Sequence, residues 1–426
     1  MAKAEIESLT GLRGIAACLV VLYHFTPADK LPLAPLRNAI GRGYLWVDLF
    51  FVLSGFVIAL NYSEMFRDGF RFGAFGKFLI RRVARLYPLY LALLAAKLAY
   101  TLAAYGGFAF HNDPNAAVLD HPAVELPINL LMIQSWGIGG SVVTSSWSIS
   151  TEVAVYLAFP ILAAMILSRH HREWALAMVV LAVCLLLAVM LLDHQDGENH
   201  RGALDAWDGR LLTPLMRCFA GFMLGLVTWR VSRSARISRL MGDERVGGAV
   251  AIALLILLGA GAPDLVIVAM FPPLILHLAE SRRSIPARLF ASKTMVFAGA
   301  LSYAIYLLHP LFEPALYDLA DWLSGRIPAL AAAGVSGTLI VACLLASSAF
   351  AHFCIERPGR RWVMRVFKPL DLKGHSPTLH GSIPVSSHGA DHASRSDLEP
   401  HPRHPAFRFR RHGGSPRLSG GPARRG

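Results

Sequence analysis

Two ionisable side chains, Arg13 and His24, lie within the first apolar segment of the chain. They are eleven residues apart, so in an α-helix they would face the same side, roughly 16 Å apart along the axis. Burying such a group in hydrocarbon costs roughly 2.5–3.5 kcal/mol, and ionisable residues in spanning helices therefore usually have a function. The pair alone leaves two interpretations open. The two residues face one site as a cation and a base, or Arg13 reaches the membrane surface while His24 bonds a neighbouring helix.

Three more ionisable residues, Asp48, Glu152 and His309, lie near the ends of other apolar segments. If successive segments cross a membrane in alternating directions, these residues and His24 all reach its outer half, and we predict that they share one polar cavity. A histidine beside a carboxylate can take a proton from a hydroxyl group. His24, Glu152 and Asp48 are therefore the candidate catalytic residues, and Asp48 also fits a charge at the membrane interface.

A cluster of arginines, which includes Arg82 and Arg85, precedes the third apolar segment. In a helix these two residues are neighbours, and their planar guanidinium groups can bind phosphate in a forked geometry. Basic residues at the end of a spanning helix also commonly set membrane orientation. Together with a base farther along, the arginines favour a long phosphorylated donor whose reactive end enters the membrane.

The composition predicts the elements that hold these residues. Of the 426 residues, 54% are hydrophobic and 16% are charged, whereas soluble domains carry about 25% charged residues. Apolar stretches of about 20 residues are long enough to cross a bilayer as helices. We predict an all-α integral membrane protein with about ten transmembrane helices, near residues 11–28, 43–62, 85–105, 145–167, 174–193, 211–230, 247–261, 263–280, 295–313 and 330–354.

Lysine and arginine gather in alternate connections between the apolar segments, most densely in residues 67–85 and 230–245. Such residues accumulate in cytoplasmic loops, so we expect both termini to be cytoplasmic. The segment 126–137 is too short to span and is expected to be re-entrant or interfacial. The five cysteines show neither disulfide nor metal-site spacing and are expected to be free thiols.

The formal net charge of +13 does not indicate nucleic-acid binding, because the basic residues form short clusters between apolar segments and lack a recognition motif. We assign residues 1–360 to a transmembrane domain and residues 361–426 to a basic, disordered cytoplasmic tail. The tail is rich in Ser, Gly, Pro, His and Arg and cannot bury enough apolar surface to fold. Its irregularly spaced histidines do not predict a metal site, and we expect no metal elsewhere.

Six motifs follow one another along most of residues 5–360. They are Thr10-Gly-Leu-Arg13 with His24, Asp48-Leu-Phe-Phe-Val-Leu-Ser-Gly-Phe56, Arg82 with Arg85, Ser146-Trp-Ser-Ile-Ser-Thr-Glu152, Leu301-Ser-Tyr-Ala-Ile-Tyr-Leu-Leu-His309, and Ile355-Glu-Arg-Pro358. In these motifs and their order the chain resembles the membrane-bound acyltransferase-3 family, whose members O-acylate bacterial surface glycans. The resemblance implies a ten-helix fold in a bacterial cytoplasmic (inner) membrane.

The resemblance also implies the reaction and its residues. The donor would be acyl-CoA, with acetyl-CoA expected, used as a co-substrate without a permanently bound cofactor. The acceptor would be a hydroxyl of a cell-surface or exported glycan, which can be lipid-linked. His24 would be at the centre of transfer, as a general base or as an acyl carrier. Candidate donor-binding residues are Arg13, Arg82 and Arg85, and candidate acceptor-binding residues are Trp147, Ser148, Tyr303 and His309.

Two other classes of protein can also contain buried charges. A glycan transporter or flippase would use the histidines and carboxylates to relay protons or bind its cargo, but the sequence shows no inverted repeat and no paired broken helices. A sensory or scaffold membrane protein would use the basic tail to bind partners and would leave the buried charges unexplained. The sequence therefore favours an acyltransferase.

Overall fold

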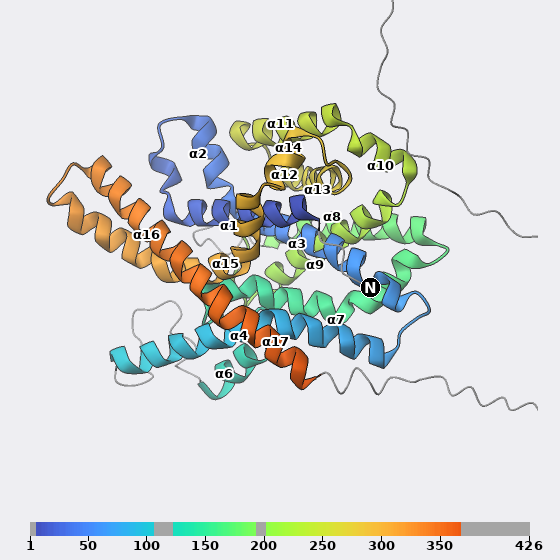
Figure 1. The fold of residues 1–426 in the computed structure, drawn as a ribbon, viewed down its shortest axis with the longest axis horizontal. Helices are drawn as coiled ribbons and strands as arrows, with labels where there is room; N and C mark the ends of the chain where they lie inside the picture. The colour runs from blue at the N-terminus through green and yellow to red at the C-terminus, as the bar shows by residue number, and fades with distance from the viewer. Residues whose placement is uncertain (1–5, 106–121, 193–201, 368–426) are drawn as a thin grey trace, which may run out of the picture. The chain divides into compact units, whose positions relative to one another are not determined.

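The computed structural model describes residues 6–105, 122–192 and 202–367, which all belong to one compact unit, Met1–Gly374. Within these ranges the chain is helical and contains no strand, in agreement with the predicted all-α class (Figure 1). The prediction of a disordered tail falls almost entirely on residues outside this description. Its first six residues, 361–366, form the end of the last helix, which runs to Val366.

Most of the α-helices follow one another with short connections, several of them 3₁₀ turns. Their bounds are α1 (Glu7–Phe25), α2 (Ala34–Gly41), α3 (Trp46–Tyr62), α4 (Phe72–Tyr105), α6 (Pro122–Leu130), α7 (Trp147–Leu167), α8 (His171–Leu192), α9 (Thr213–Ser232), α10 (Ala235–Gly242), α11 (Glu244–Ala260), α12 (Asp264–Ala269), α13 (Phe271–Glu280), α14 (Ile285–Phe290), α15 (Lys293–Ser324), α16 (Ala329–Ala351) and α17 (Arg357–Val366).

Seven stretches of the described chain are helical, long and apolar enough to cross a membrane. They are Glu7–Phe25, Ala34–Phe66, Phe72–Tyr100, Thr144–Leu167, His171–Leu192, Lys293–Ser324 and Ala329–Val366. The protein is therefore a multi-pass membrane protein. The other three predicted spans correspond to α9, to α11 and to the short helices α12 and α13, so the count of ten and the cytoplasmic position of both termini stay predictions.

The segment 126–137 forms the end of α6 and a loop that folds back on the start of α7. In this loop the backbone N–H of Ser135 donates to Ser150 Oγ at 3.1 Å, and Trp136 Nε1 donates to the carbonyl of Ser150 at 2.9 Å. Non-helical backbone at membrane depth is tolerated where protein groups satisfy it. The loop thus holds the first turn of α7, which carries Ser148 and precedes Glu152.

Close helix crossings form the centre of the fold. α1 packs along α15, and α3 packs along α9 (Figure 1). At the second crossing, a Cβ atom added to Gly55 of α3 would overlap the carbonyl of Phe222, and one added to Gly225 of α9 would overlap the carbonyl of Val52. Small residues let helix backbones approach closely in membranes, where van der Waals packing drives association. The glycines therefore set the distance between α3 and α9.

Gly225→Ala should lower the free energy of unfolding by about 1–3 kcal/mol, because the added methyl group meets backbone that cannot move aside. Thermal unfolding in detergent would measure the loss. Gly334→Ala on α16 is the matched control, since a Cβ atom at Gly334 has no atom within 4 Å. Equal stability of the two variants would mean that α9 shifts freely along α3.

Candidate functional site

His24 and His309 are brought together by the packing of α1 against α15, with ring centroids 4.7 Å apart. His24 lies in the last turn of α1, and His309 is buried in the middle of α15. Nδ1 of His24 lies 2.9 Å from the carbonyl of Val20, and Nδ1 of His309 lies 2.7 Å from the carbonyl of Tyr306. The structure therefore pairs two residues that the sequence placed on separate helices.

The hydrogen bonds of these two rings determine their tautomers. A carbonyl oxygen can only accept, so Nδ1 carries the proton in both His24 and His309. In the neutral form each ring then keeps a lone pair on Nε2, which is the atom a general base uses. The end of α1 and the middle of α15 thus present two bases side by side.

A cavity of about 120 Å³ lies between α1, α3, α4, α7 and α15. Six of the residues singled out in the sequence line it, namely Arg13, Arg82, Arg85, Ser148, Glu152 and Tyr303. A second pocket, of about 190 Å³, shares Arg13, Val57, Arg82 and Arg85 with the first and adds Arg81 and Arg360. The arginines predicted to bind a donor therefore lie where the two hollows meet.

Arg82 is held at this junction by aromatic side chains. Only 9% of its surface is exposed, and its Nη2 donates to the hydroxyl of Tyr62 at 3.0 Å. Its guanidinium carbon lies 5.0 Å from the centre of the Tyr62 ring and 5.9 Å from that of Tyr156. The Nε–H is buried and has no hydrogen-bond partner among the described residues. Buried donors are almost always satisfied, so this group lacks an acceptor that a bound anion can supply.

Polar side chains continue from the arginines toward the histidines. The Tyr156 hydroxyl donates to Glu152 Oε2 at 2.9 Å, which fixes one carboxylate oxygen inside the cavity. Farther along, the Ser148 and Tyr306 hydroxyls lie 2.8 Å apart. Tyr306 lines the cavity, and its ring lies 5.7 Å from that of His309. Tyr306 thus connects the arginine-lined cavity with the pair of histidines.

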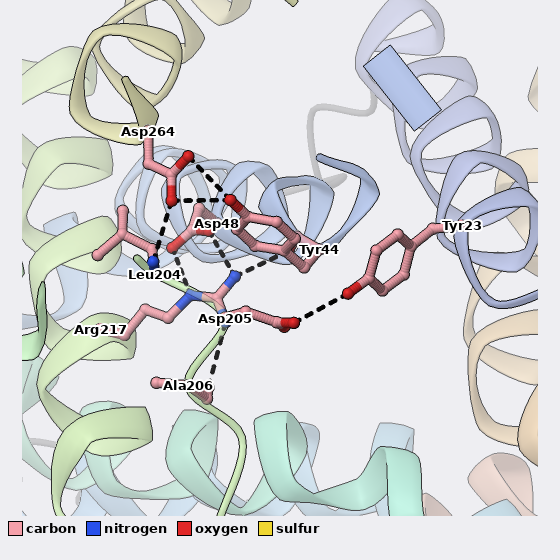
Figure 2. Close-up of polar contacts among 8 residues, drawn as sticks. All are labelled: Tyr23, Tyr44, Asp48, Leu204, Asp205, Ala206, Arg217 and Asp264. Atoms are coloured by element: carbon pink, nitrogen blue, oxygen red, sulfur yellow. Dashed lines mark hydrogen bonds and ion pairs between the residues drawn. The ribbon is translucent and has the colours of Figure 1, made fainter. Parts of the chain in front are cut away.

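Asp48 has different neighbours from those expected. Both of its carboxylate oxygens accept from Arg217 of α9, at 2.8 Å from Nε and 2.6 Å from Nη2, and only 1% of each side chain is exposed. Figure 2 shows that Arg217 also donates to the carbonyls of Tyr44 and Ala206. The same guanidinium lies 5.6 Å from the ring of Trp147. Asp48 and Trp147 therefore belong to a buried ionic cluster.

Neighbouring contacts extend this ionic cluster (Figure 2). The Tyr44 hydroxyl donates to Asp264, at 2.8 Å from each carboxylate oxygen, and the backbone N–H of Leu204 donates to Asp264 Oδ2 at 3.0 Å. On the side of α1, the Tyr23 hydroxyl donates to Asp205 Oδ2 at 2.9 Å. The cluster thus ties α1 and α3 to the connection that precedes α9 and to the first residue of α12.

Four ionisable residues were predicted to share one cavity, but in the structure they lie in three separate groups. His24 contacts His309, Glu152 lies with the arginines, and Asp48 pairs with Arg217. The sequence analysis did not single out Arg217, although an arginine within the apolar segment 211–230 was visible and meets the same criterion as Arg13. Arg360, the last residue of the predicted transmembrane domain, was likewise given no role.

A family model described as an acyltransferase domain, Acyl_transf_3, matches residues 6–347 of the chain. The chain belongs to the acyltransferase-3 family. It is therefore a membrane acyltransferase that acts on hydroxyl groups, an O-acyltransferase, which agrees with the interpretation of its motifs.

Named relatives agree with this assignment. The chain is 28% identical to acyltransferase MdmB of Streptomyces mycarofaciens over 393 residues, which cover 85% of this chain and 93% of that protein. It is 24% identical to O-acetyltransferase OatA of Staphylococcus aureus over 341 residues, which cover 76% of this chain and 53% of OatA. The chain thus spans about half the length of OatA. No solved structure gives a significant match.

The buried ion pair gives a test of what Asp48 does in this acyltransferase. Asp48→Leu should cost about 3–5 kcal/mol of stability, because it leaves the charge of Arg217 buried and unpaired. The double variant Asp48→Leu/Arg217→Met should recover most of that loss, since apolar residues of similar size often replace buried pairs without penalty. Unfolding in detergent and acyl transfer would be measured together.

The matched control is Arg67→Met, which removes the exposed ion pair with Glu64 and should cost less than about 1 kcal/mol. A stable Asp48→Leu protein that has lost transfer would instead assign Asp48 to the chemistry.

Proposed function

We propose that the protein transfers an acyl group, acetyl in the first instance, from cytoplasmic acyl-CoA to a hydroxyl of a cell-surface or exported glycan. One observation carries this proposal. An arginine-lined cavity reaches Tyr306, the ring of Tyr306 lies beside that of His309, and His309 lies beside His24. The Nε2 atoms of both histidines are available as bases. A phosphate-binding end joined to a basic end is what a long thioester donor needs.

The donor would enter at the arginines. The diphosphate of CoA would lie at Arg13, Arg82 and Arg85, where charge-assisted hydrogen bonds are strong and the buried Nε–H of Arg82 needs an acceptor. The apolar side chains that line the first cavity, among them Phe50 and Leu53, would hold the pantetheine arm. The thioester would then lie near Tyr306.

His24 would act at the thioester. Its Nε2 takes the proton of the acceptor hydroxyl while the hydroxyl oxygen attacks the thioester carbonyl. The new C–O ester bond forms, the C–S bond breaks, and the proton passes to the thiolate of CoA. In a variant of this route the acyl group first moves to Nε2 of His24 and then to the hydroxyl. The neighbouring His309 would help to bind the acceptor or to relay the proton.

The acceptor would reach the histidines from the outer side of a bacterial cytoplasmic membrane, as a lipid-linked or newly exported glycan. Ser148 and Tyr303, which line the cavity, are the acceptor-binding candidates that the geometry favours. Glu152 would orient the reactants from the cavity wall. Asp48 and Trp147 would support the site through the ion pair with Arg217 and contact no substrate.

His24→Gln should reduce acyl transfer by about 10²–10⁴-fold, because the side chain keeps a polar atom but loses the base. Binding of acetyl-CoA should persist in this variant, since the arginines are intact. Purified protein in lipid vesicles, labelled acetyl-CoA and a panel of lipid-linked and soluble glycans would measure both quantities.

The control is His170→Gln, an exposed residue in the turn between α7 and α8, which should leave transfer unchanged. Full transfer by a folded His24→Gln protein would refute the central role of His24. Glycan movement across the vesicle membrane without use of acetyl-CoA would instead favour the transporter.

A further inference from the structure

One arginine of the second pocket, Arg360, comes from α17, at the far end of the sequence. α16 continues into α17 through a π-helical turn, His352–Glu356. Nδ1 of His352 lies 2.8 Å from Oε2 of Glu356 across that turn, so an ion pair or hydrogen bond closes it. Single π-turns inside helices change the direction of the side chains that follow and occur often at functional sites.

α17 reaches the pocket by packing against α4 (Figure 1). At the contact, a Cβ atom on Gly359 would overlap the ring of Pro88, so only glycine allows this approach. The residue that follows, Arg360, then enters the lining of the pocket beside Arg81, Arg82 and Arg85 of α4. The close contact explains how an exposed helix brings a guanidinium group to the arginine cluster.

The lining residues give the two hollows an order. Tyr306 and Glu152 line only the first cavity, the one connected to the histidines. Arg81 and Arg360 line only the second pocket, and Arg82 lines both. Arg360 therefore lines the pocket on the other side of Arg82 from the cavity that Tyr306 lines.

We propose that Arg360 binds the 3′-phosphate of the CoA donor and makes the enzyme selective for 3′-phosphorylated donors. This inference rests on the proposed use of acyl-CoA. From the thioester outward, CoA consists of pantetheine, the diphosphate and the ribose that carries the 3′-phosphate. With the thioester near Tyr306 and the diphosphate at Arg82, the ribose phosphate falls on Arg360.

The charges of the second pocket fit this ligand. Five arginines line it, and its lining contains no Asp or Glu. A diphosphate and a phosphate monoester together carry three to four negative charges, which such a cluster can bind in forked hydrogen bonds. The buried Nε–H of Arg82, which lacks a partner among the described residues, independently indicates that an anion belongs at this junction.

The test compares acetyl-CoA with 3′-dephospho-acetyl-CoA as donors for the wild type, Arg360→Gln and Arg361→Gln. Arg361 is the matched control, because it is an exposed arginine on the same helix that does not line the pocket. We expect the wild type and Arg361→Gln to show a KM about tenfold lower for acetyl-CoA than for the dephospho donor. Arg360→Gln should lose this difference, with kcat and the KM for the dephospho donor unchanged.

The outcomes separate this inference from the proposed function. Wild-type selectivity that persists in Arg360→Gln would overturn the role of Arg360 while acyl-CoA stays the donor. An equal rise in KM for both donors would also overturn it, since Arg360 would then bind another part of CoA. Partial recovery of selectivity in Arg360→Lys would support it, because lysine keeps the charge without the fork. Failure of the wild type to use either donor would refute the proposed function itself.

Discussion

The buried ion pair of Asp48 with Arg217 is the interaction on which the rest of the site depends. Two hydrogen bonds join α3 to α9 with almost no exposure to solvent. A charge left alone in such surroundings costs several kcal/mol, so neither helix can slide or turn without losing its partner. The glycines of the same crossing allow the close approach, and the ion pair determines the register.

This constraint reaches the reactive groups through shared helices. α3 supplies Phe50 and Val57 to the walls of the arginine-lined cavity, and Tyr44, just before α3, bonds both Asp264 and Arg217. α1, which carries Arg13 and His24, is tied to the same cluster by the bond of Tyr23 to Asp205. The structure therefore separates two uses of buried charge. Paired charges hold helices in place, and the arginines of the cavity face space that a substrate can occupy.

Much of this arrangement was predictable from the sequence, because the residue type shows which side chains cost free energy when they are buried in a membrane. An ionisable side chain within an apolar segment stands out, and this criterion found Arg13, Asp48, Glu152 and His309. The helical class and most of the spans follow from apolar length alone. The family resemblance, confirmed by the match to residues 6–347, added the reaction class.

The sequence did not predict which of these residues are neighbours. Placing charges at a common depth does not fix the rotation of each helix about its axis. That rotation decides that Asp48 faces Arg217 while His24 faces His309.

The short helices α12 and α13 also depart from a simple span, since a break at Met270 divides their apolar stretch. Arg360 could not be placed, because its position depends on a π-turn and on one contact with Pro88.

α4 is longer than the hydrocarbon core of a bilayer is thick, and its excess length decides at which level its arginines lie. Its 34 residues make a helix about 51 Å long, whereas the hydrocarbon core of a bilayer is about 30 Å thick. About 20 Å of the helix must therefore tilt or project beyond the acyl chains. Arg82 lies ten residues after Phe72, the first residue of α4, and so about 15 Å from that end. If this end projects, the arginines lie at the level of the lipid headgroups. A water-soluble, highly charged molecule could then be held at that level while only its uncharged arm enters the protein, and no charge would have to cross the hydrophobic layer.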